Sequence, residues 1–392
     1  MEFEKWPYYD TEQINAVCNT LISGNVNYWT GTQTKQFEEN FAEWCGTKFS
    51  IALANGTAAL DASYKSLRLE NDDEVITTPR TFIATSSSAI INGLKPIFAD
   101  VDADSGNISP TSISERITKR TKAIAVVHIG GWPAEIKKIL DIAKTYNLKV
   151  IEDCSQAHGA AIKINEKFKS VGSFGDVSTW SFCQDKIMTT GGEGGMITTN
   201  SSDIWEFIWS FKDHGKSYKE VHNNQNKEGF KWLHENIGSN LRLTEMQSAL
   251  GNIQLERIHE WNKIRSKNAS IISNKIKDLD IIRVPTIPEN VRHAWYKYYC
   301  YLKPKNIKSD WSRTRIIKEI NKIGFPAFEG GCGEIYLEKI FKKFALAPDI
   351  RLPVAKRLSE TSLMFVVHPT ISLENMEIYA DSIRKVLIMA SK

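Results

Sequence analysis

The sequence of 392 residues lacks any long apolar run, and no stretch approaches the ~18 to 20 apolar residues that a transmembrane helix needs. Its N-terminal stretch, MEFEKWPYYD, has no basic segment followed by an apolar one, so we expect no signal peptide. It also lacks an excess of one charge: 50 Lys plus Arg and 46 Asp plus Glu, mixed along the chain, give a net charge of +4. These absences predict a cytoplasmic protein with no membrane or nucleic-acid partner.

The chain also lacks cysteine pairs and Cys/His clusters at metal-ligand spacing, so we expect buried free thiols and no metal site. It has no internal repeat and no low-complexity tract. Its length favours two domains, at about 100 to 200 residues per domain. We place a large domain at 1–258 and a smaller C-terminal domain at 259–392. The six cysteines are Cys18, Cys45, Cys154, Cys183, Cys300 and Cys332.

What the sequence does contain is an alternation of short apolar strands with amphipathic helices. Two segments each read as strand, helix and strand: EVITTPRTFIATSSSAIINGLKPIFADVD and AIAVVHIGGWPAEIKKILDIAKTYNLKVIEDCSQAHGA. Such units predict right-handed crossovers and a mostly parallel sheet covered by helices on both faces. From Ile281 the pattern changes to short strands, including His293 to Leu302, and helices. The predicted fold class is therefore α/β, with a large parallel-sheet domain and a smaller α+β domain.

One strand leads into a helix through a glycine turn. The segment from Phe49 to Ala54 predicts a strand, which turns at Asn55-Gly56-Thr57 into an alanine-rich helix. The first backbone N–H groups of a helix lack intrahelical partners and the helix dipole is positive there, so this turn is a candidate phosphate site. The alternative is an ordinary strand-to-helix connection with no ligand.

Polar and aromatic residues follow the other predicted strands, at the carboxyl ends where ligands of parallel sheets bind. Thr81-Phe82, His128 and Glu152-Asp153-Cys154-Ser155-Gln156 lie there. Asp153 directly follows a buried apolar run, and a buried carboxylate needs a cationic or hydrogen-bonding partner. A protonated ring nitrogen would satisfy it. The alternative is a carboxylate that only caps the next segment.

The stretch STWSFCQDKIMTTGGEGGMITTN places one lysine, Lys186, between an apolar run and four glycines. An amine partly withdrawn from water loses some preference for its charged form, so a fraction is neutral and can attack a carbonyl. Lys186 is therefore a candidate nucleophile. Taken alone, a lysine beside glycines is more often a solvated loop residue.

Five blocks, in this order and at these separations, resemble the DegT/DnrJ/StrS family of sugar-nucleotide aminotransferases, which are fold-type-I enzymes of pyridoxal 5'-phosphate (PLP). The resemblance covers essentially the whole chain. Two further blocks, HIGGWPAE and GGCGEIYLEKIF, resemble the branch that aminates UDP-linked 4-keto-6-deoxy-N-acetylhexosamines. The five blocks are ANGTAAL, TTPRTFIAT, VIEDCSQAHGA, SFGDVSTWSFCQDKIMTTGGEGGMITTN and NIGSNLRLTEMQSALG.

The resemblance implies a role for each candidate residue. Lys186 matches the lysine that holds PLP covalently and moves the proton, and Asp153 matches the acid that pairs with the pyridine nitrogen. Phe82 matches the aromatic residue that stacks on the cofactor ring, and Gln156 the residue that bonds the ring hydroxyl. Because one phosphate contact comes from the partner subunit, the resemblance also implies a homodimer with shared active sites. The phosphate contacts match Gly56, Thr57, Ser181 and, from the partner, Asn240.

The implied reaction has two halves. L-glutamate leaves its amine as pyridoxamine phosphate, and a nucleotide-linked ketosugar then accepts it. The acceptor implied by the branch is UDP-2-acetamido-2,6-dideoxy-4-ketohexose, which would give a 4-amino sugar for a surface polysaccharide such as O-antigen.

Four alternatives compete with this interpretation. Three keep the scaffold: a C3-keto dTDP-sugar aminotransferase, a PLP-dependent sugar dehydratase, and a binding protein without catalysis. The dehydratases of the family carry histidine at the position of Lys186, which argues against the second. A nicotinamide enzyme is disfavoured because GGEGG precedes a strand-like run, whereas the dinucleotide fingerprint follows a strand and opens a helix.

Two features depart from the family pattern. The motif TTGGEGG is one glycine longer than the commoner TTGEGG, so the loop after Lys186 is expected to take a different path. A polar insertion from Asp213 to Lys231 is expected near the mouth of the site.

Overall fold

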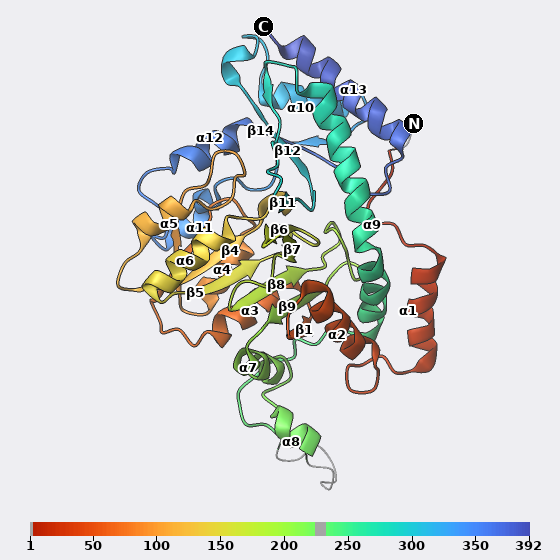
Figure 1. The fold of residues 1–392 in the computed structure, drawn as a ribbon, viewed down its shortest axis with the longest axis vertical. Helices are drawn as coiled ribbons and strands as arrows, with labels where there is room; N and C mark the ends of the chain where they lie inside the picture. The colour runs from red at the N-terminus through yellow and green to blue at the C-terminus, as the bar shows by residue number, and fades with distance from the viewer. Residues whose placement is uncertain (1–2, 224–232) are drawn as a thin grey trace.

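The computed structural model describes residues 3–223 and 233–392. A large α/β domain carries a smaller domain at one end, and both chain termini lie beside the smaller domain (Figure 1). This mixed α/β architecture, with a mostly parallel sheet, confirms the predicted fold class.

In the described residues, seven strands form the large sheet in the order β1-β9-β8-β5-β4-β2-β3. All neighbours pair in parallel except those of β9, which runs antiparallel to both β1 and β8. The predicted strand at Phe49 ends one residue earlier than expected. The strands are β1 (Phe49–Leu53), β2 (Glu74–Thr77), β3 (Lys95–Phe98), β4 (Thr121–Val127), β5 (Lys149–Asp153), β8 (Val177–Ser181) and β9 (Gly195–Thr199).

Helices cover both faces of this sheet. The helices of this part of the chain are α1 (Thr11–Ser23), α2 (Gln33–Cys45), α3 (Gly56–Ser66), α4 (Ala84–Ile91), α5 (Pro110–Arg116), α6 (Ile136–Tyr146), α7 (Ser202–Lys212), α8 (Tyr218–Asn223) and α9 (Glu245–Ile276), of which α1 packs on α9 and α8 follows α7. Successive side chains of a strand point to opposite faces, so each strand feeds two apolar layers. On β4, Ala123 and Ala125 pack with residues of α3, α4 and α7, whereas Ile124 and Val126 pack with residues of α5 and α6.

The smaller domain contains a four-stranded antiparallel sheet in the order β10-β12-β14-β13. Its core packs against the far half of α9 and against α10 and α13. The predicted strands from His293 to Leu302 are correct only in part, because the strand begins at Tyr298. The elements are β10 (Ile282–Arg283), β12 (Tyr298–Leu302), β13 (Ala327–Phe328), β14 (Ser362–Phe365), α10 (Arg313–Lys322), α11 (Lys339–Lys343), α12 (Pro353–Thr361) and α13 (Leu373–Ala390).

The long helix α9 joins the two domains (Figure 1). Its start is fixed by a capping box, in which Thr244 and Gln247 satisfy each other's free backbone N–H groups. Ile258 packs in the large-domain core and Ile272 in the small-domain core. A division into 1–258 and 259–392 would therefore cut this helix where its packing partners change, and we keep it as a proposed division.

After α9 the chain returns to the large domain at β11 (Val291–Arg292) and again at residues 335–358, which pack on Phe98 and Val101. In the first of these returns, β11 pairs with β6 (Ala161–Ile164), which also pairs with β7 (Lys167–Ser170). Among the helices of the described residues, none combines the length and apolarity that crossing a bilayer requires. All six cysteines are free thiols; Cys45, Cys154 and Cys300 are buried, Cys183 is half-buried, and Cys18 and Cys332 are exposed.

Candidate active site

The predicted phosphate residues meet where β8, β9 and β1 end or begin. Ser181, the last residue of β8, pairs with Gly195 of β9, which in turn pairs with Leu53 at the end of β1. A Cβ added to Gly56 would lie 2.7 Å from the Cβ of Ser181, so these segments approach as closely as they do only because this position is glycine. The structure therefore brings Gly56 and Ser181 together.

The helix that begins at Gly56, α3, has its N-terminus at this junction. Asn55 caps it by accepting a hydrogen bond from the Ala58 N–H at 2.8 Å, and Thr57 is exposed. Gly195 lies against the same turn, since an added Cβ would be 2.4 Å from the Asn55 carbonyl oxygen. A glycine cradle around a helix N-terminus suits a phosphate group.

Asp153 ends β5 and is only 5% exposed. Its Oδ2 accepts a hydrogen bond from the Thr85 hydroxyl at 2.8 Å, and its Oδ1 accepts one from the Ser155 N–H at 3.1 Å. No ion pair to Asp153 occurs within residues 3–223 and 233–392. The carboxylate thus does cap the next segment, and it also stays without the cation that burial demands.

Thr85 is a residue that the sequence reasoning missed. Its hydroxyl lies 2.9 Å from that of Thr81, and its carbonyl oxygen accepts a hydrogen bond from the buried Tyr64 hydroxyl at 2.7 Å. Two threonines four residues apart at the start of a helix were the signal, because such a spacing places side chains on one face.

Two further predicted residues, Phe82 and Gln156, have groups available to a ligand: an exposed aromatic ring and an amide NH₂ group. Phe82 follows β2 and is 68% exposed, an unusual state for a large aromatic side chain. Gln156 is half-buried, and its Oε1 accepts a hydrogen bond from the Gly130 N–H at 2.8 Å, which leaves its amide N–H groups to donate.

Lys186 lies half-buried in the loop after β8. The backbone N–H of Lys186 donates a hydrogen bond to the Cys183 carbonyl at 3.0 Å, and its backbone carbonyl accepts one from the Trp6 indole N–H at 2.7 Å. The Nζ atom is 5.1 Å from the centroid of the Tyr296 ring. Because the hydroxyl of Tyr296 donates to Asp185, this ring is held in place beside the amine.

The longer glycine motif closes back onto the lysine loop. Gly191 and Gly192 have φ values of 83° and 120°, which favour glycine. No atom lies within 4 Å of a Cβ added to Gly192, so glycine is favoured there by its backbone conformation and not by lack of space. The Gln184 N–H donates to the Gly192 carbonyl at 3.0 Å. The additional glycine therefore serves a turn that contacts the segment carrying Lys186.

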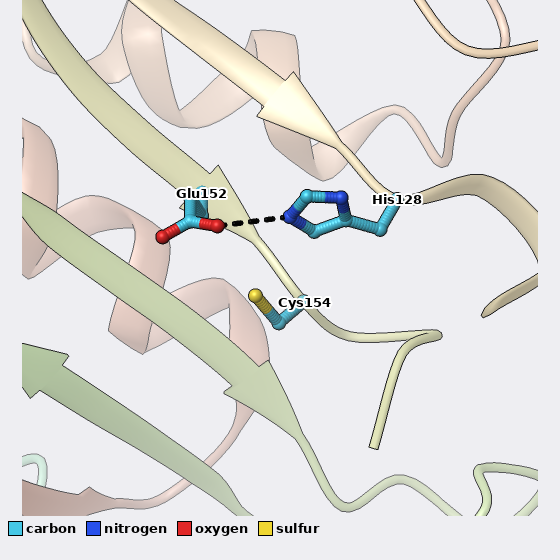
Figure 2. A group of neighbouring side chains, drawn as sticks. All are labelled: His128, Glu152 and Cys154. Carbon is cyan, nitrogen blue, oxygen red and sulfur yellow. Dashed lines mark hydrogen bonds and ion pairs between the residues drawn. The ribbon is translucent and has the colours of Figure 1, made fainter. Parts of the chain in front are cut away.

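Beside Asp153, His128 and Glu152 form a buried pair near Cys154 (Figure 2). The Ala134 N–H donates to His128 Nδ1 at 3.0 Å, so Nε2 carries the proton and donates to Glu152 at 3.1 Å. Burial raises the pKa of the Cys154 thiol well above its ordinary range. With both imidazole nitrogens engaged and the thiol neutral, these side chains serve a hydrogen-bond network and have no free metal-ligand set.

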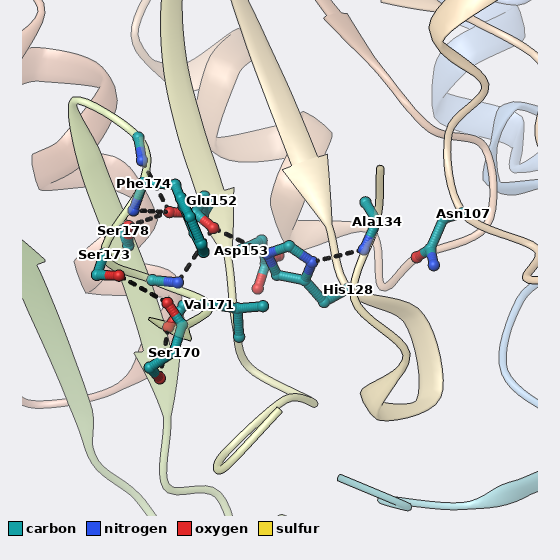
Figure 3. Close-up of polar contacts among 12 residues, drawn as sticks. Asn107, His128, Ala134, Glu152, Asp153, Ser170, Val171, Ser173, Phe174 and Ser178 are labelled. Atoms are coloured by element: carbon teal, nitrogen blue, oxygen red, sulfur yellow. Dashed lines mark hydrogen bonds and ion pairs between the residues drawn. The ribbon is translucent and has the colours of Figure 1, made fainter. Parts of the chain in front are cut away.

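Glu152 is the centre of this network (Figure 3). Besides His128, its two oxygens accept hydrogen bonds from the hydroxyl of Ser178 at 3.2 Å and from three backbone N–H groups. Burial alone would raise the pKa of Glu152, but the hydrogen bonds from His128 and these N–H groups outweigh it and lower the pKa. The backbone donors are Gly172, Phe174 and Gly175, at 3.0, 2.8 and 2.8 Å.

Asn240 lies on the surface of the subunit, in a β-bridge with Asp213. No hydrogen bond within the described residues joins it to Lys186 or Asp153 of the same subunit. Asp213 is buried and pairs with Lys216 at 3.2 Å and with Arg242, so it has a structural role at the base of the insertion. The part of the predicted insertion at 224–232 lies outside the described residues.

The chain belongs to the DegT/DnrJ/EryC1/StrS aminotransferase family, whose model matches residues 7–384. It is 47% identical to the aminotransferase from Psychrobacter cryohalolentis, whose solved structure has a TM-score of 0.96 with 99% of each chain covered. It is 31% identical to the dTDP-3-amino-3,6-dideoxy-alpha-D-galactopyranose transaminase of Aneurinibacillus thermoaerophilus, over 97% of this chain and 99% of that one. It is also 35% identical to the GDP-perosamine synthase of Escherichia coli O157:H7, over 73% of each.

Family membership confirms the expected enzyme class, a PLP-dependent aminotransferase of sugar nucleotides. The residues of this chain fit that cofactor. Asp153 is a buried carboxylate that lacks a cation, and Phe82 is an aromatic ring without packing partners on its exposed side. The glycine cradle at the start of α3 and the amine of Lys186 complete the set.

We predict that Glu152→Gln destabilises the protein by about 1.5–3 kcal/mol at pH 7, because the amide NH₂ group cannot accept the hydrogen bonds that one carboxylate oxygen receives. The folded pKa of Glu152 is lowered from 4.5, so its contribution is complete above pH 4.5 and is lost as the pH falls through the folded value. The stability difference between wild type and variant should therefore shrink in acid. Urea unfolding at pH 7 and at lower pH measures it.

The control is Glu70→Gln, an exposed site that should change stability by less than about 0.5 kcal/mol. Equal urea midpoints for wild type and Glu152→Gln at pH 7 would contradict the role given to this network.

Proposed function

We propose that this aminotransferase moves the amino group of L-glutamate to the C4 keto group of UDP-2-acetamido-2,6-dideoxy-4-ketohexose. The observation that carries the proposal is the unpaired carboxylate of Asp153 at the end of β5, beside the strand that leads to Lys186. A buried acid and a half-buried amine on neighbouring strand ends are what an enzyme needs to bind PLP and to move a proton at a donor's α-carbon.

The residues divide the work as follows. Lys186 holds PLP covalently, and its amine, once released by the donor, moves the proton. Asp153 keeps the ring nitrogen protonated, and Thr85 and Ser155 orient its two oxygens. When bound, PLP supplies an electron sink that allows the amine to leave the donor and later join the ketosugar. Phe82 stacks on the cofactor ring.

The phosphate end is held by the junction of three strands. Gly56 and Thr57 offer backbone N–H groups at the start of α3, and Ser181 adds a hydroxyl. Gln156 donates from its amide to the ring hydroxyl, because its Oε1 is already engaged by Gly130. Asn240 completes the phosphate site from the partner subunit of a homodimer, which agrees with its surface position.

The choice of a 4-keto sugar is supported by the resemblance of the block GGCGEIYLEKIF to the branch that uses this acceptor. This block lies close to the expected cofactor site, since the Ile335 N–H donates to the Pro79 carbonyl at 2.9 Å, three residues before Phe82. The similarity to a relative named as a dTDP-3-amino-sugar transaminase supports C3 amination as the second candidate. The presence of Lys186 argues against a dehydratase. We further propose a cytoplasmic role in surface polysaccharide synthesis, such as that of O-antigen.

We predict that the protein purified with PLP shows visible absorbance that bleaches with L-glutamate, and that Lys186→Ala abolishes turnover. Borohydride reduction of wild type should leave the phosphopyridoxyl mass on the peptide that contains Lys186, because only a Schiff base is fixed in this way. Mass spectrometry of the digest reads this directly. The exposed Lys137→Ala is the control and should behave as wild type. Label on another lysine, or repeated turnover by Lys186→Ala, would exclude the proposed role.

We predict that L-glutamate supports amination of the UDP-linked 4-keto sugar and not of a dTDP-linked 3-keto sugar. The reason is that the acceptor's carbonyl carbon must lie over the reacting atoms, and a one-carbon displacement lowers the rate strongly. A panel of 3-keto and 4-keto nucleotide sugars, with NMR of each product, measures this. Amination of the 3-keto sugar alone would replace the proposed acceptor while leaving the reaction type in place.

We predict that Lys186→Ala and Asn240→Ala restore activity when mixed, unfolded and refolded together. In a mixed dimer one site then has both native residues, so random pairing recovers about one quarter of the sites. Neither variant refolded alone should show this gain. Activity assays with size-exclusion chromatography test both the dimer and the position of Asn240. No recovery from a mixed dimer would contradict a contribution of Asn240 across the interface.

A further inference from the structure

Arg80 is a buried arginine without a counter-charge. It lies between the end of β2 and Phe82, and it is only 4% exposed. Its Nε and Nη1 atoms are buried and have no hydrogen-bond partner among the described residues. The centroid of the Tyr301 ring lies 6.0 Å from its guanidinium carbon. A guanidinium withdrawn from water in this way calls for an anionic ligand.

Arg80 lines a small, partly open pocket of about 20 Å³ between the two domains. The aromatic side chains of Trp132, Trp295 and Tyr299 form its walls, and His293 also lines it. Trp295 has a φ of 50°, which a bulky residue rarely adopts. Both domains therefore supply fixed aromatic surfaces around one unpaired charge.

Two charged side chains line the pocket, those of Arg80 and Asp104. The carboxylate of Asp104 forms an ion pair with Arg283 at 3.1 Å, and the guanidinium of Arg283 lies over the ring of Tyr301. His293 is neutral because burial lowers its pKa to about 3. Arg80 is thus the uncompensated charge among the residues that line the pocket. A planar group with one negative charge matches it, and a carboxylate can take both N–H groups of a guanidinium side by side. A diphosphate would bring more negative charge than the pocket balances.

The pocket adjoins the expected reacting position. Gly130 donates to Gln156, and an added Cβ on Gly130 would lie 3.1 Å from the Tyr299 ring, so one short segment borders both sites. Arg80 is also only two residues from Phe82. From this shared segment we infer that a group held by Arg80 is bonded close to the reacting carbon. The α-carboxylate of an amino acid is bonded directly to that carbon.

We propose that Arg80 binds the α-carboxylate of the amino donor. This inference rests on the proposed function, because it takes the donor to be L-glutamate. In the bound state Nε–H and a terminal N–H of Arg80 donate to the two carboxylate oxygens, and the aromatic walls exclude water from the pair. The acceptor sugar, which has no carboxylate, makes no use of Arg80.

The two half-reactions separate these roles, and the test uses Arg80→Gln and Arg80→Lys holoenzymes. In stopped-flow measurements of the first half-reaction, Arg80→Gln should need about 10- to 150-fold more L-glutamate for half-saturation, the loss expected from a hydrogen bond to a charged group. Arg80→Lys should fall between, because it keeps the charge and loses the planar pair of donors. Enzyme already carrying the amine should react with the ketosugar at the wild-type rate.

A binding readout makes the test independent of turnover. Maleate, a dicarboxylate without an amine, should raise the melting temperature of wild-type holoenzyme and not that of Arg80→Gln. Arg283→Gln is the matched control, an arginine near the same tyrosine whose charge is already paired, and it should keep the wild-type response to L-glutamate. Cofactor absorbance and the melting temperature without ligand confirm that each variant is folded and loaded.

The outcomes are distinct. Wild-type enzyme that does not react with L-glutamate at all would contradict the proposed donor. If wild type reacts and Arg80→Gln shows the same dependence on L-glutamate and the same response to maleate, the assignment of Arg80 alone is overturned. A defect confined to the second half-reaction would also overturn it and would assign Arg80 to an anionic group of the nucleotide sugar.

Discussion

The hydrogen-bond network of Glu152 is the interaction on which the geometry of the site depends (Figure 3). It ties the end of β5 to His128 after β4 and to the loop that precedes β8. Successive residues of a strand point to opposite faces, so Glu152 and Asp153 face different surroundings although they are neighbours. The carboxylate of Glu152 accepts hydrogen bonds on both oxygens from several donors, whereas the buried carboxylate of Asp153 accepts two hydrogen bonds and has no cationic partner among the described residues. The first residue fixes the strand end, and the second can therefore serve a ligand.

The absence of an ion-pair partner among the described residues is also the feature by which we separate functional from structural buried charges elsewhere in the chain. Lys212 is buried, but it pairs with Glu38 at 2.7 Å and lies over the Tyr28 ring. Arg265 is also buried, and its Nη1 lies 3.4 Å from two backbone carbonyls, whereas its Nε and Nη2 have no hydrogen-bond partner among the described residues. Burial lowers its pKa to about 9. For the Nε and Nη1 atoms of Arg80, the described residues supply neither an acid nor a carbonyl acceptor. Asp153 and Arg80 are thus two buried charges without an ion pair among the described residues, and in the proposed function the first serves a ring nitrogen and the second a carboxylate.

The sheet and its strand-end residues could be predicted from the sequence because both follow from local patterns. Alternation along β4 and helical periodicity specify the layers, and parallel strands bring their carboxyl ends to one edge. The segment around Trp295 could not be predicted. It reads as a strand but is held by contacts with residues far away in the sequence, namely the carbonyls of Gly130 and Gly131 at 3.0 and 2.9 Å. Arg80 was missed for a related reason: its neighbours in sequence are ordinary, and its lack of a partner is visible only in three dimensions.

The attachments between the two domains fix the relative positions of the residues that line the Arg80 pocket. The smaller domain is attached to the larger one by the continuous helix α9 and, further along the chain, by the pairing of β11 with β6. Residues 335–358 add a third attachment, because they pack on Phe98 and Val101. The second attachment continues directly into the residues around Trp295 that line the pocket. These attachments together restrict rotation of one domain against the other more than a single helix would. The aromatic walls are consequently placed before a donor arrives, so less binding free energy is lost in ordering them, and the charge of Arg80 keeps a fixed position relative to Phe82.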